Sequence, residues 1–319
     1  MAIQKSSSTG FSTAKTINFN LLGRHTFNNN RKLSKSQQSE ISPTIQHMTN
    51  THLFDSLDAF RNEPVPSGKV RLHWFGQLSV GIKDETGVII LVDPYFPHDR
   101  PDDRYIYSNP PLKESDLHVD HVLLTHDHGD HTCPETLTRI HTAHPNCEYT
   151  GTKASAQRIV QQIGVPEDKV RSITAGQSYQ LGTMTAHAVY AKPPRSLPDD
   201  NIEAPDTEHL GYVVETKSIR VYISGDPINT FPKYPDLINP VAALKPDIGF
   251  LVTHPNEGEF PYFAESAEMA TKIGLKAAAP AHYECFTQRT FDPYEWSNSF
   301  PKDLPERIII PYNRGILYP

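Results

Sequence analysis

The chain has 319 residues, a formal net charge of −7, and hydrophobic residues at 37% of its positions. That length allows one or two globular domains, and the acidic balance gives no basic footprint for nucleic acid. We therefore expect the partner to be a small-molecule substrate and not a nucleic acid. The sequence has no stretch of 18 apolar residues, so it predicts no membrane-spanning helix.

Residues 1–49 differ in composition from the rest of the chain. They are rich in Ser, Thr, Asn and Gln, and they contain no acidic residue before Glu40. Such a segment cannot bury a core, and we interpret it as a disordered extension, an organelle transit peptide or an overlong start ahead of Met48. The three cysteines lie far apart, which favours a reducing compartment. We expect a cytoplasmic protein, or a mitochondrial one if this leader is a transit peptide.

The next segment, residues 50–67, is predicted to form a short amphipathic helix and a linker. Apolar side chains recur there at helical spacing, and two prolines end the pattern. One continuous domain is expected from residue 68 to residue 319, and it opens with three strand patterns before residue 93. A long loop rich in Pro, Asp and Tyr follows at 95–116, and loops of this length often face a substrate.

A segment rich in metal-ligating side chains spans residues 125–132, directly after an apolar run at 122–124. It holds three histidines and two aspartates. Alternate side chains of an extended segment share one face, so His126 and His128 can converge on one metal ion. The spacing therefore predicts a metal site at the end of a strand.

The following residues extend this site. Gly129 permits a turn that brings Asp130 and His131 towards the same place, where they can bind a second ion. Imidazole and carboxylate ligands suit zinc, manganese or iron, and sites of this kind with open positions are more often catalytic than structural. Thr132 and Glu135 have the spacing of a capping box, which predicts a helix from there to about residue 143.

These residues resemble a known family. The string His126-x-His128-x-Asp130-His131 after an apolar strand resembles the signature of the metallo-β-lactamase superfamily. The chain is similar to the L-ascorbate-6-phosphate lactonase-like branch in three stretches, namely Trp74-Phe75-Gly76-Gln77, Leu91-Val92-Asp93-Pro94-Tyr95 and Thr125 to Leu137. The resemblance covers about residues 69–319. It implies an α/β (α+β) fold, a four-layer αββα sandwich with two sheets face to face and helices outside.

The resemblance also implies the distant ligands of the metal site. Asp226 is expected to be the carboxylate that bridges two ions, and His282, in a Pro-x-His-Tyr string, the last histidine of the second ion. The superfamily usually supplies a third histidine for the first ion near residue 187, and His187 is the nearest candidate, with His209 as a weaker substitute. Asp93 is expected to organise the adjacent loops.

Two further side chains are candidates for contact with substrate. Arg195 lies in a loop after a predicted strand, and its guanidinium suits bidentate recognition of phosphate or carboxylate. His254 begins a polar loop after the strand at 248–253, and the resemblance implies that this loop lines the site.

The residues themselves predict metal-assisted hydrolysis of a carbonyl or phosphoryl ester, with two divalent cations activating water and Asp130 orienting it and carrying a proton. The resemblance implies a lactone as substrate, phosphorylated in the most similar branch, with zinc or manganese as the ion. A phosphodiesterase acting on a nucleotide or a phospholipid headgroup is the main alternative. A metal-binding sensor without hydrolytic activity is the other.

Overall fold

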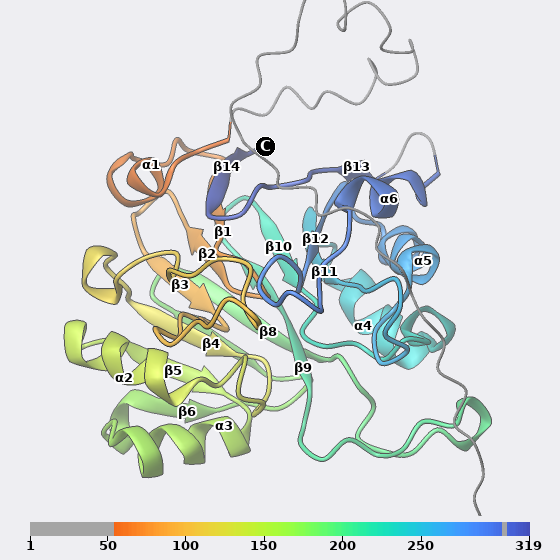
Figure 1. The fold of residues 1–319 in the computed structure, drawn as a ribbon, viewed down its shortest axis with the longest axis horizontal. Coiled ribbons are helices and arrows are strands. Elements are labelled where there is room, and N and C mark those ends of the chain that lie inside the picture. The colour runs from red at the N-terminus through yellow and green to blue at the C-terminus, as the bar shows by residue number, and fades with distance from the viewer. Residues whose placement is uncertain (1–53, 302–304) are drawn as a thin grey trace, which may run out of the picture. The chain divides into compact units, whose positions relative to one another are not determined.

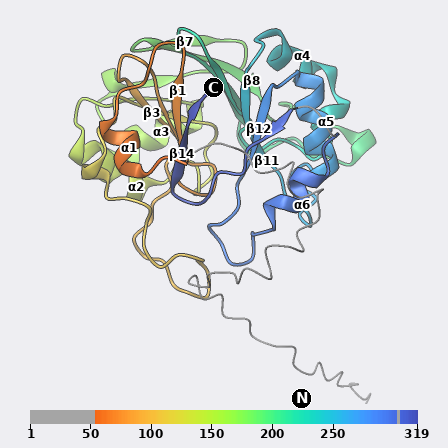
Figure 2. The ribbon, with the colours of Figure 1, turned by 90° about the horizontal axis from the view of Figure 1, so that it is seen from above.

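The computed structural model describes residues 54–301 and 305–319, and the predicted leader at 1–49 lies outside this range (Figure 1). Its two seven-stranded sheets face each other. Helices cover the outer side of each sheet, as Figure 2 shows from above. The predicted four-layer αββα sandwich is therefore confirmed. Within the described ranges, no helix is long and apolar enough to cross a bilayer.

The first sheet contains β14 and the strands of the first half of the chain. In spatial order its strands are β14 (Arg314–Tyr318), β1 (Val70–Trp74), β2 (Val80–Lys83), β3 (Ile89–Val92), β4 (His121–Leu124), β5 (Glu148–Gly151) and β6 (Val170–Ser172). Strands β14 to β3 pair antiparallel, and β3 to β6 pair parallel. Neighbouring parallel strands need a crossover connection, and the helices that follow β4 and β5 provide it.

The second sheet has the same kind of mixed pairing. Its order is β13 (Glu306–Arg307), β12 (Ala277–Ala281), β11 (Ile248–Val252), β10 (Arg220–Ile223), β9 (Leu210–Glu215), β8 (Met184–Tyr190) and β7 (Ser178–Leu181). Strands β10 to β13 run parallel, whereas β7 to β10 run antiparallel. The end of β10, the end of β12 and the start of β9 therefore lie at one edge of this sheet.

In the part of the chain that the structure describes, six α-helices lie on the outer faces. Helices α1 (Leu57–Asn62), α2 (Pro134–Ala143) and α3 (Lys153–Arg158), with its π-helical extension Ile159–Ile163, pack on the first sheet, and α4 (Pro235–Ala243), α5 (Phe263–Ile273) and α6 (Pro293–Asn298) pack on the second. Among residues 54–301 and 305–319, 3-10 turns occur at Glu114–Asp116, Glu167–Lys169, Pro198–Asp200 and Phe231–Lys233.

The predicted capping box at the start of α2 is wrong. Cys133 is the N-cap residue, and its side chain makes no capping hydrogen bond. The Thr132 hydroxyl instead donates to the main-chain oxygen of His126 at 2.7 Å. The Glu135 carboxylate accepts from the main-chain N–H of His98 at 2.9 Å. Thr132 therefore stabilises the metal-ligand loop and not the helix end.

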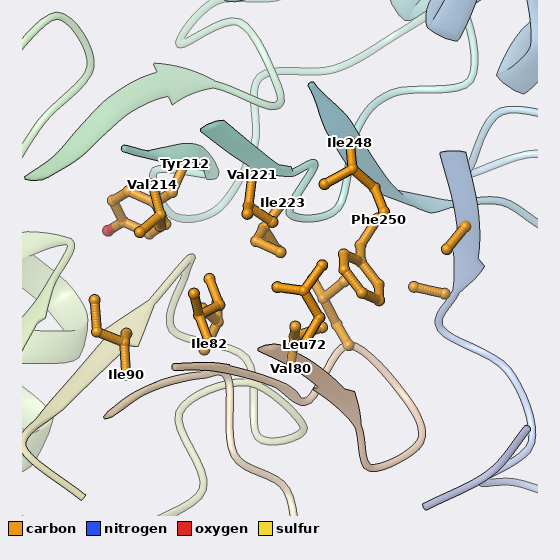
Figure 3. Close-up of a cluster of buried hydrophobic side chains, with 14 of the residues drawn as sticks. Leu72, Val80, Ile82, Ile90, Tyr212, Val214, Val221, Ile223, Ile248 and Phe250 are labelled. Carbon is orange, nitrogen blue, oxygen red and sulfur yellow. The ribbon is translucent and has the colours of Figure 1, made fainter. Parts of the chain in front are cut away.

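The main hydrophobic core fills the space between the sheets. Alternate residues of each strand point inward, so the two inner faces meet directly. Figure 3 shows side chains from both sheets in contact range, among them Leu72, Val80, Ile82 and Ile90 of the first sheet and Val214, Val221, Ile223 and Phe250 of the second. Full burial of one such side chain stabilises the fold by about 1.5–3 kcal/mol.

Gly225 ends the turn after β10, and its backbone conformation sets the position of the next residue, Asp226. Its φ of +61° lies in the left-handed region, and a Cβ there would clash with the carbonyl oxygen of Leu210. We expect Gly225→Ala to lower the free energy of unfolding by about 3 kcal/mol, from backbone strain plus overpacking. Urea denaturation measures this loss.

Gly164→Ala is the matched control for this substitution. Gly164 also has a positive φ, +79°, but no atom lies within 4 Å of its virtual Cβ. The control should cost only the conformational penalty, about 1 kcal/mol. Equal losses for the two variants would show that the close approach at Gly225 does not constrain the turn.

Candidate metal centre

Three overlapping groups of histidine and aspartate side chains lie where strands of both sheets end. The groups are His126, His128 and His209; His126, His131 and Asp226; and Asp130, His131 and His282. Within each group the candidate ligand atoms lie within 4.8 Å of one another. The structure therefore brings the predicted side chains together, except that His209 lies in the cluster in place of His187.

Backbone contacts between the two sheets hold these residues in place. The main-chain N–H of Leu210, at the start of β9, donates to the carbonyl of Thr125 after β4 at 2.9 Å. The N–H of His282, after β12, donates to the carbonyl of Gln77 at 2.7 Å. These bonds fix His209 and His282 beside the loop that follows β4.

Asp226 lies between histidines of all three groups. Its Oδ2 lies 3.3 Å from His131 Nε2 and 3.6 Å from His126 Nε2, and its Oδ1 lies 3.6 Å from His282 Nε2. Burial disfavours its charge, but His131 and His282 hold the pKa of Asp226 well below its usual range. It is therefore an anionic ligand at neutral pH, positioned between two sets of imidazoles.

The tautomers of His126 and His131 follow from the hydrogen bonds on their Nδ1 atoms. Asp93 Oδ2 lies 2.7 Å from His131 Nδ1 and accepts the Thr125 hydroxyl proton at 2.5 Å. Since that hydroxyl uses its single hydrogen in the bond to Asp93, it accepts a hydrogen bond from His126 Nδ1 at 3.0 Å. Both rings therefore carry hydrogen on Nδ1, and their Nε2 atoms face the cluster.

Asp93 was expected to organise the adjacent loops, and its contacts agree with that role. It is fully buried, and its other oxygen accepts the main-chain N–H of Thr125 at 2.8 Å. One carboxylate thus orients the start of the ligand loop and a histidine of the cluster.

Gln77 connects Asp130 with His282. Its amide nitrogen donates to Asp130 Oδ2 at 2.8 Å and lies 2.9 Å from His282 Nε2. The indole N–H of Trp74 donates to the Gln77 carbonyl at 2.9 Å and so shapes this turn. The stretch from Trp74 to Gln77 carries part of the family resemblance, but no local spacing gives Gln77 a role, and only the fold brings it to the cluster.

The charges of the cluster favour cations. Burial opposes the imidazolium form of His131, but the carboxylates of Asp226, Asp130 and Asp93 raise its pKa well above the usual range. Burial, with His131 nearby, lowers the pKa of His126 well below the usual range, so this ring is neutral. The negative potential of these carboxylates, which holds a proton on the buried ring of His131, also attracts a metal ion. Such an ion would displace that proton.

Of the two histidines that the sequence offered for the first ion, His209 lies in the cluster and His187 does not. His209 stacks on His126 with ring centroids 4.0 Å apart, and burial lowers its pKa to about 3. His187 lies within β8, where its ring binds the Ser178 hydroxyl at 2.8 Å and Glu215 at 3.0 Å. Those two partners satisfy both of its ring nitrogens.

Asp206 is a neighbour of the cluster that the sequence analysis did not name. Both of its carboxylate oxygens lie 3.2 Å from His128 Nε2, and one lies 3.9 Å from His209 Nε2. In the sequence, only its position three residues before His209 pointed to a place beside the cluster. It adds a negative charge on the solvent side of this group.

The two predicted substrate contacts differ in position. Arg195 is exposed and pairs with Asp236 at 2.9 Å, so the structure does not bring it to the cluster. His254 is buried, and its Nδ1 accepts the main-chain N–H groups of Asn256 and Glu257 at 3.2 and 3.1 Å. Its Nε2 therefore carries the hydrogen and has no partner within the described residues. His254 is a hydrogen-bond donor and not a metal ligand.

The cluster fits a pair of divalent cations on its own chemistry. Within the described part of the chain, several of its buried ligand atoms have no hydrogen-bond partner: Nε2 of His126, Nε2 of His131, both ring nitrogens of His209 and Oδ1 of Asp226. Buried polar atoms without partners are rare in folded proteins, and a metal ion explains such a convergent set.

Comparison with known proteins agrees with this geometry. The family model described as a beta-lactamase superfamily domain matches residues 89–283. A UPF0173 protein of Pyrococcus furiosus is 28% identical over 241 residues, which covers 75% of this chain and 93% of the relative. A UPF0173 metal-dependent hydrolase of Hyperthermus butylicus is 25% identical over 255 residues, covering 77% of this chain and 98% of the relative.

A solved structure shares the fold. The isothiocyanate hydrolase from Delia radicum gut bacteria has a TM-score of 0.58 at 15% identity, and the superposition covers 77% of this chain and 98% of that one. The family model spans more than half of this chain and includes the segments that bear five of the clustered histidines. On these grounds the chain belongs to the metallo-β-lactamase superfamily.

Proposed function

We propose that this protein is a metal-dependent hydrolase that binds two divalent cations and cleaves a lactone or another ester of a small metabolite. The observation that carries the proposal is a pair of ligand groups, one on each side of the buried carboxylate of Asp226, which lies within 3.6 Å of a histidine of each group. The relatives named as metal-dependent hydrolases support the reaction class. The resemblance of the Trp74 to Gln77 and Asp93 stretches to the lactonase-like branch supports the lactone.

In this proposal each cation has its own protein ligands. The first set is His126, His128 and His209, and the second set is Asp130, His131 and His282. Asp226, which lies close to His126, His131 and His282, would bind both cations. Zinc or manganese suits these ligands, and iron is also compatible with them. A pair of bound divalent cations lowers the pKa of water from 15.7 to about 7 and polarises the carbonyl under attack.

The chain itself supplies orientation and proton transfer. Asp130 is half-buried, and its Oδ2 is held by Gln77, so its other oxygen can accept a proton from the attacking water. His131 and His282 keep the pKa of Asp130 below its usual range although burial opposes this, so the carboxylate is ionised at neutral pH. The Nε2–H of His254 is free to donate to a substrate oxygen.

A panel of substrates tests the proposed reaction. We expect the protein loaded with Mn²⁺ or Zn²⁺ to hydrolyse simple lactones and to leave bis(p-nitrophenyl) phosphate essentially intact. Activity should vanish after treatment with a chelator and return with metal. Faster turnover of the phosphodiester would favour the phosphodiesterase alternative. Stoichiometric metal without turnover in either arm would favour a sensor.

A pair of histidine variants tests the ligand assignment. His209→Ala should remove one ligand of the first set, and metal analysis should then show a loss of about one bound ion per chain at micromolar free metal. His187→Ala is the matched control and should keep the metal content of the wild type, because its ring bonds only to Ser178 and Glu215. The opposite pattern would restore His187 as the ligand.

Asp93→Asn tests the tautomer argument. An amide can offer a hydrogen where His131 Nδ1 needs an acceptor, so the ring would lose its orientation. We expect a 10- to 100-fold loss of metal affinity, which competition with a chromophoric chelator measures. Asp84→Asn changes another buried carboxylate and should leave affinity unchanged. Equal affinities for wild type and Asp93→Asn would contradict this role.

A further inference from the structure

An open groove of about 760 Å³ leads directly to the candidate metal centre. Gly129 and Asp130 of the ligand loop form part of its lining, and no atom lies within 4 Å of the virtual Cβ of Gly129. The remaining lining comes from the loop after β3 and the loop after β12. A substrate with its scissile bond beside Asp130 would extend along this groove.

Two loops that are bonded to each other form the outer wall of the groove. The main-chain N–H of Ile106 donates to the carbonyl of Cys285 at 3.0 Å, and the N–H of Thr287 donates to the carbonyl of Arg104 at 2.9 Å. Tyr105 and Phe286 face each other in this bridge, with ring centroids 5.3 Å apart. Two loops that are distant in sequence are thus joined before any ligand arrives.

Arg104 projects from this wall into a groove that Asp103 and Asp130 also line. Its guanidinium carbon lies 5.4 Å from the Phe286 ring centroid and 5.5 Å from that of Tyr105. Within residues 54–301 and 305–319, no carboxylate lies within ion-pair distance of it. Aromatic faces hold the guanidinium plane in place but leave its N–H groups free to bind an anion.

Arg289 adds a second cation to the same groove. Among the described residues its guanidinium is bound only through Nε, to Glu257 at 3.1 Å, and its central carbon lies 5.8 Å from the ring centroid of Phe260. That ring in turn contacts His282 of the candidate metal centre, with centroids 5.0 Å apart. In a chain with a net charge of −7, two arginines in one groove are a local feature and not a general basic surface.

We infer that Arg104 and Arg289 form an anion subsite that selects substrates bearing a carboxylate or a phosphate monoester away from the bond that is hydrolysed. The inference rests on the proposed function for the position of that bond. Fork-shaped guanidinium groups bind both kinds of anion through paired N–H donors, so the two sources share one chemistry. The apolar part of the substrate would lie against Phe286 and Tyr95.

Two matched pairs of lactones test the inference with metal-loaded protein. One pair is γ-butyrolactone and its 3-carboxylate, and the other is glucono-δ-lactone and its 6-phosphate. The ratio of kcat/KM for the charged member to that for the neutral member should fall about 10- to 100-fold in Arg104→Gln, mainly through KM. The pair that shows the larger fall identifies the anion.

Arg289→Gln provides the second variant and Arg61→Gln the control. Arg61 is exposed on α1 and does not line the groove, so its variant should keep the wild-type ratio. Ratios near one in the wild type for both pairs, or ratios unchanged in both groove variants, would overturn the subsite.

A binding arm separates this inference from the proposed reaction. Calorimetry on the metal-free full chain compares gluconate with 6-phosphogluconate and with glucarate, which adds a second carboxylate. Tighter binding of at least one doubly anionic ligand, lost in Arg104→Gln, supports the subsite even if no lactone is hydrolysed. Hydrolysis without any such preference would leave the reaction intact and remove the subsite.

Discussion

The buried carboxylate of Asp226 is the constraint around which this edge of the sandwich is arranged. It is 3% exposed, and three imidazole nitrogens lie within 3.6 Å of its oxygens. An ion removed from water costs several kcal/mol unless close partners compensate for it. The end of β10 must therefore stay in register with the ends of β4 and β12, and a metal pair between them would repay the cost of burial.

The two sheets meet this constraint through main-chain bonds and not through side chains alone. The bond from Leu210 to Thr125 joins β9 to the ligand loop, and the bond from His282 to Gln77 joins β12 to the turn after β1. Trp74 stacks on Tyr283 with centroids 4.7 Å apart at the same junction. Such contacts position the side chains of the cluster more precisely than mobile loops would.

Selectivity for the substrate depends on loops and not on the strand ends that bear the cluster. The cluster of histidines and aspartates is built on strand ends, whereas the groove beside it is walled by the loops at 95–107 and 284–289. Relatives can share the strand-end chemistry and differ in these loops, because loops tolerate change without loss of the core. The arginines of the groove are thus the natural place for this chain's own substrate choice.

The sequence by itself determined the local part of this protein. The alternation from His126 to His131 brings ligands together through the geometry of a few adjacent residues, and the Gly before Asp226 marked a tight turn. Tertiary structure decided between His209 and His187. Strand pairing gives His187 two polar neighbours, Ser178 and Glu215, and turns the start of β9 towards β4. Such choices depend on the register of distant strands, which no local spacing encodes.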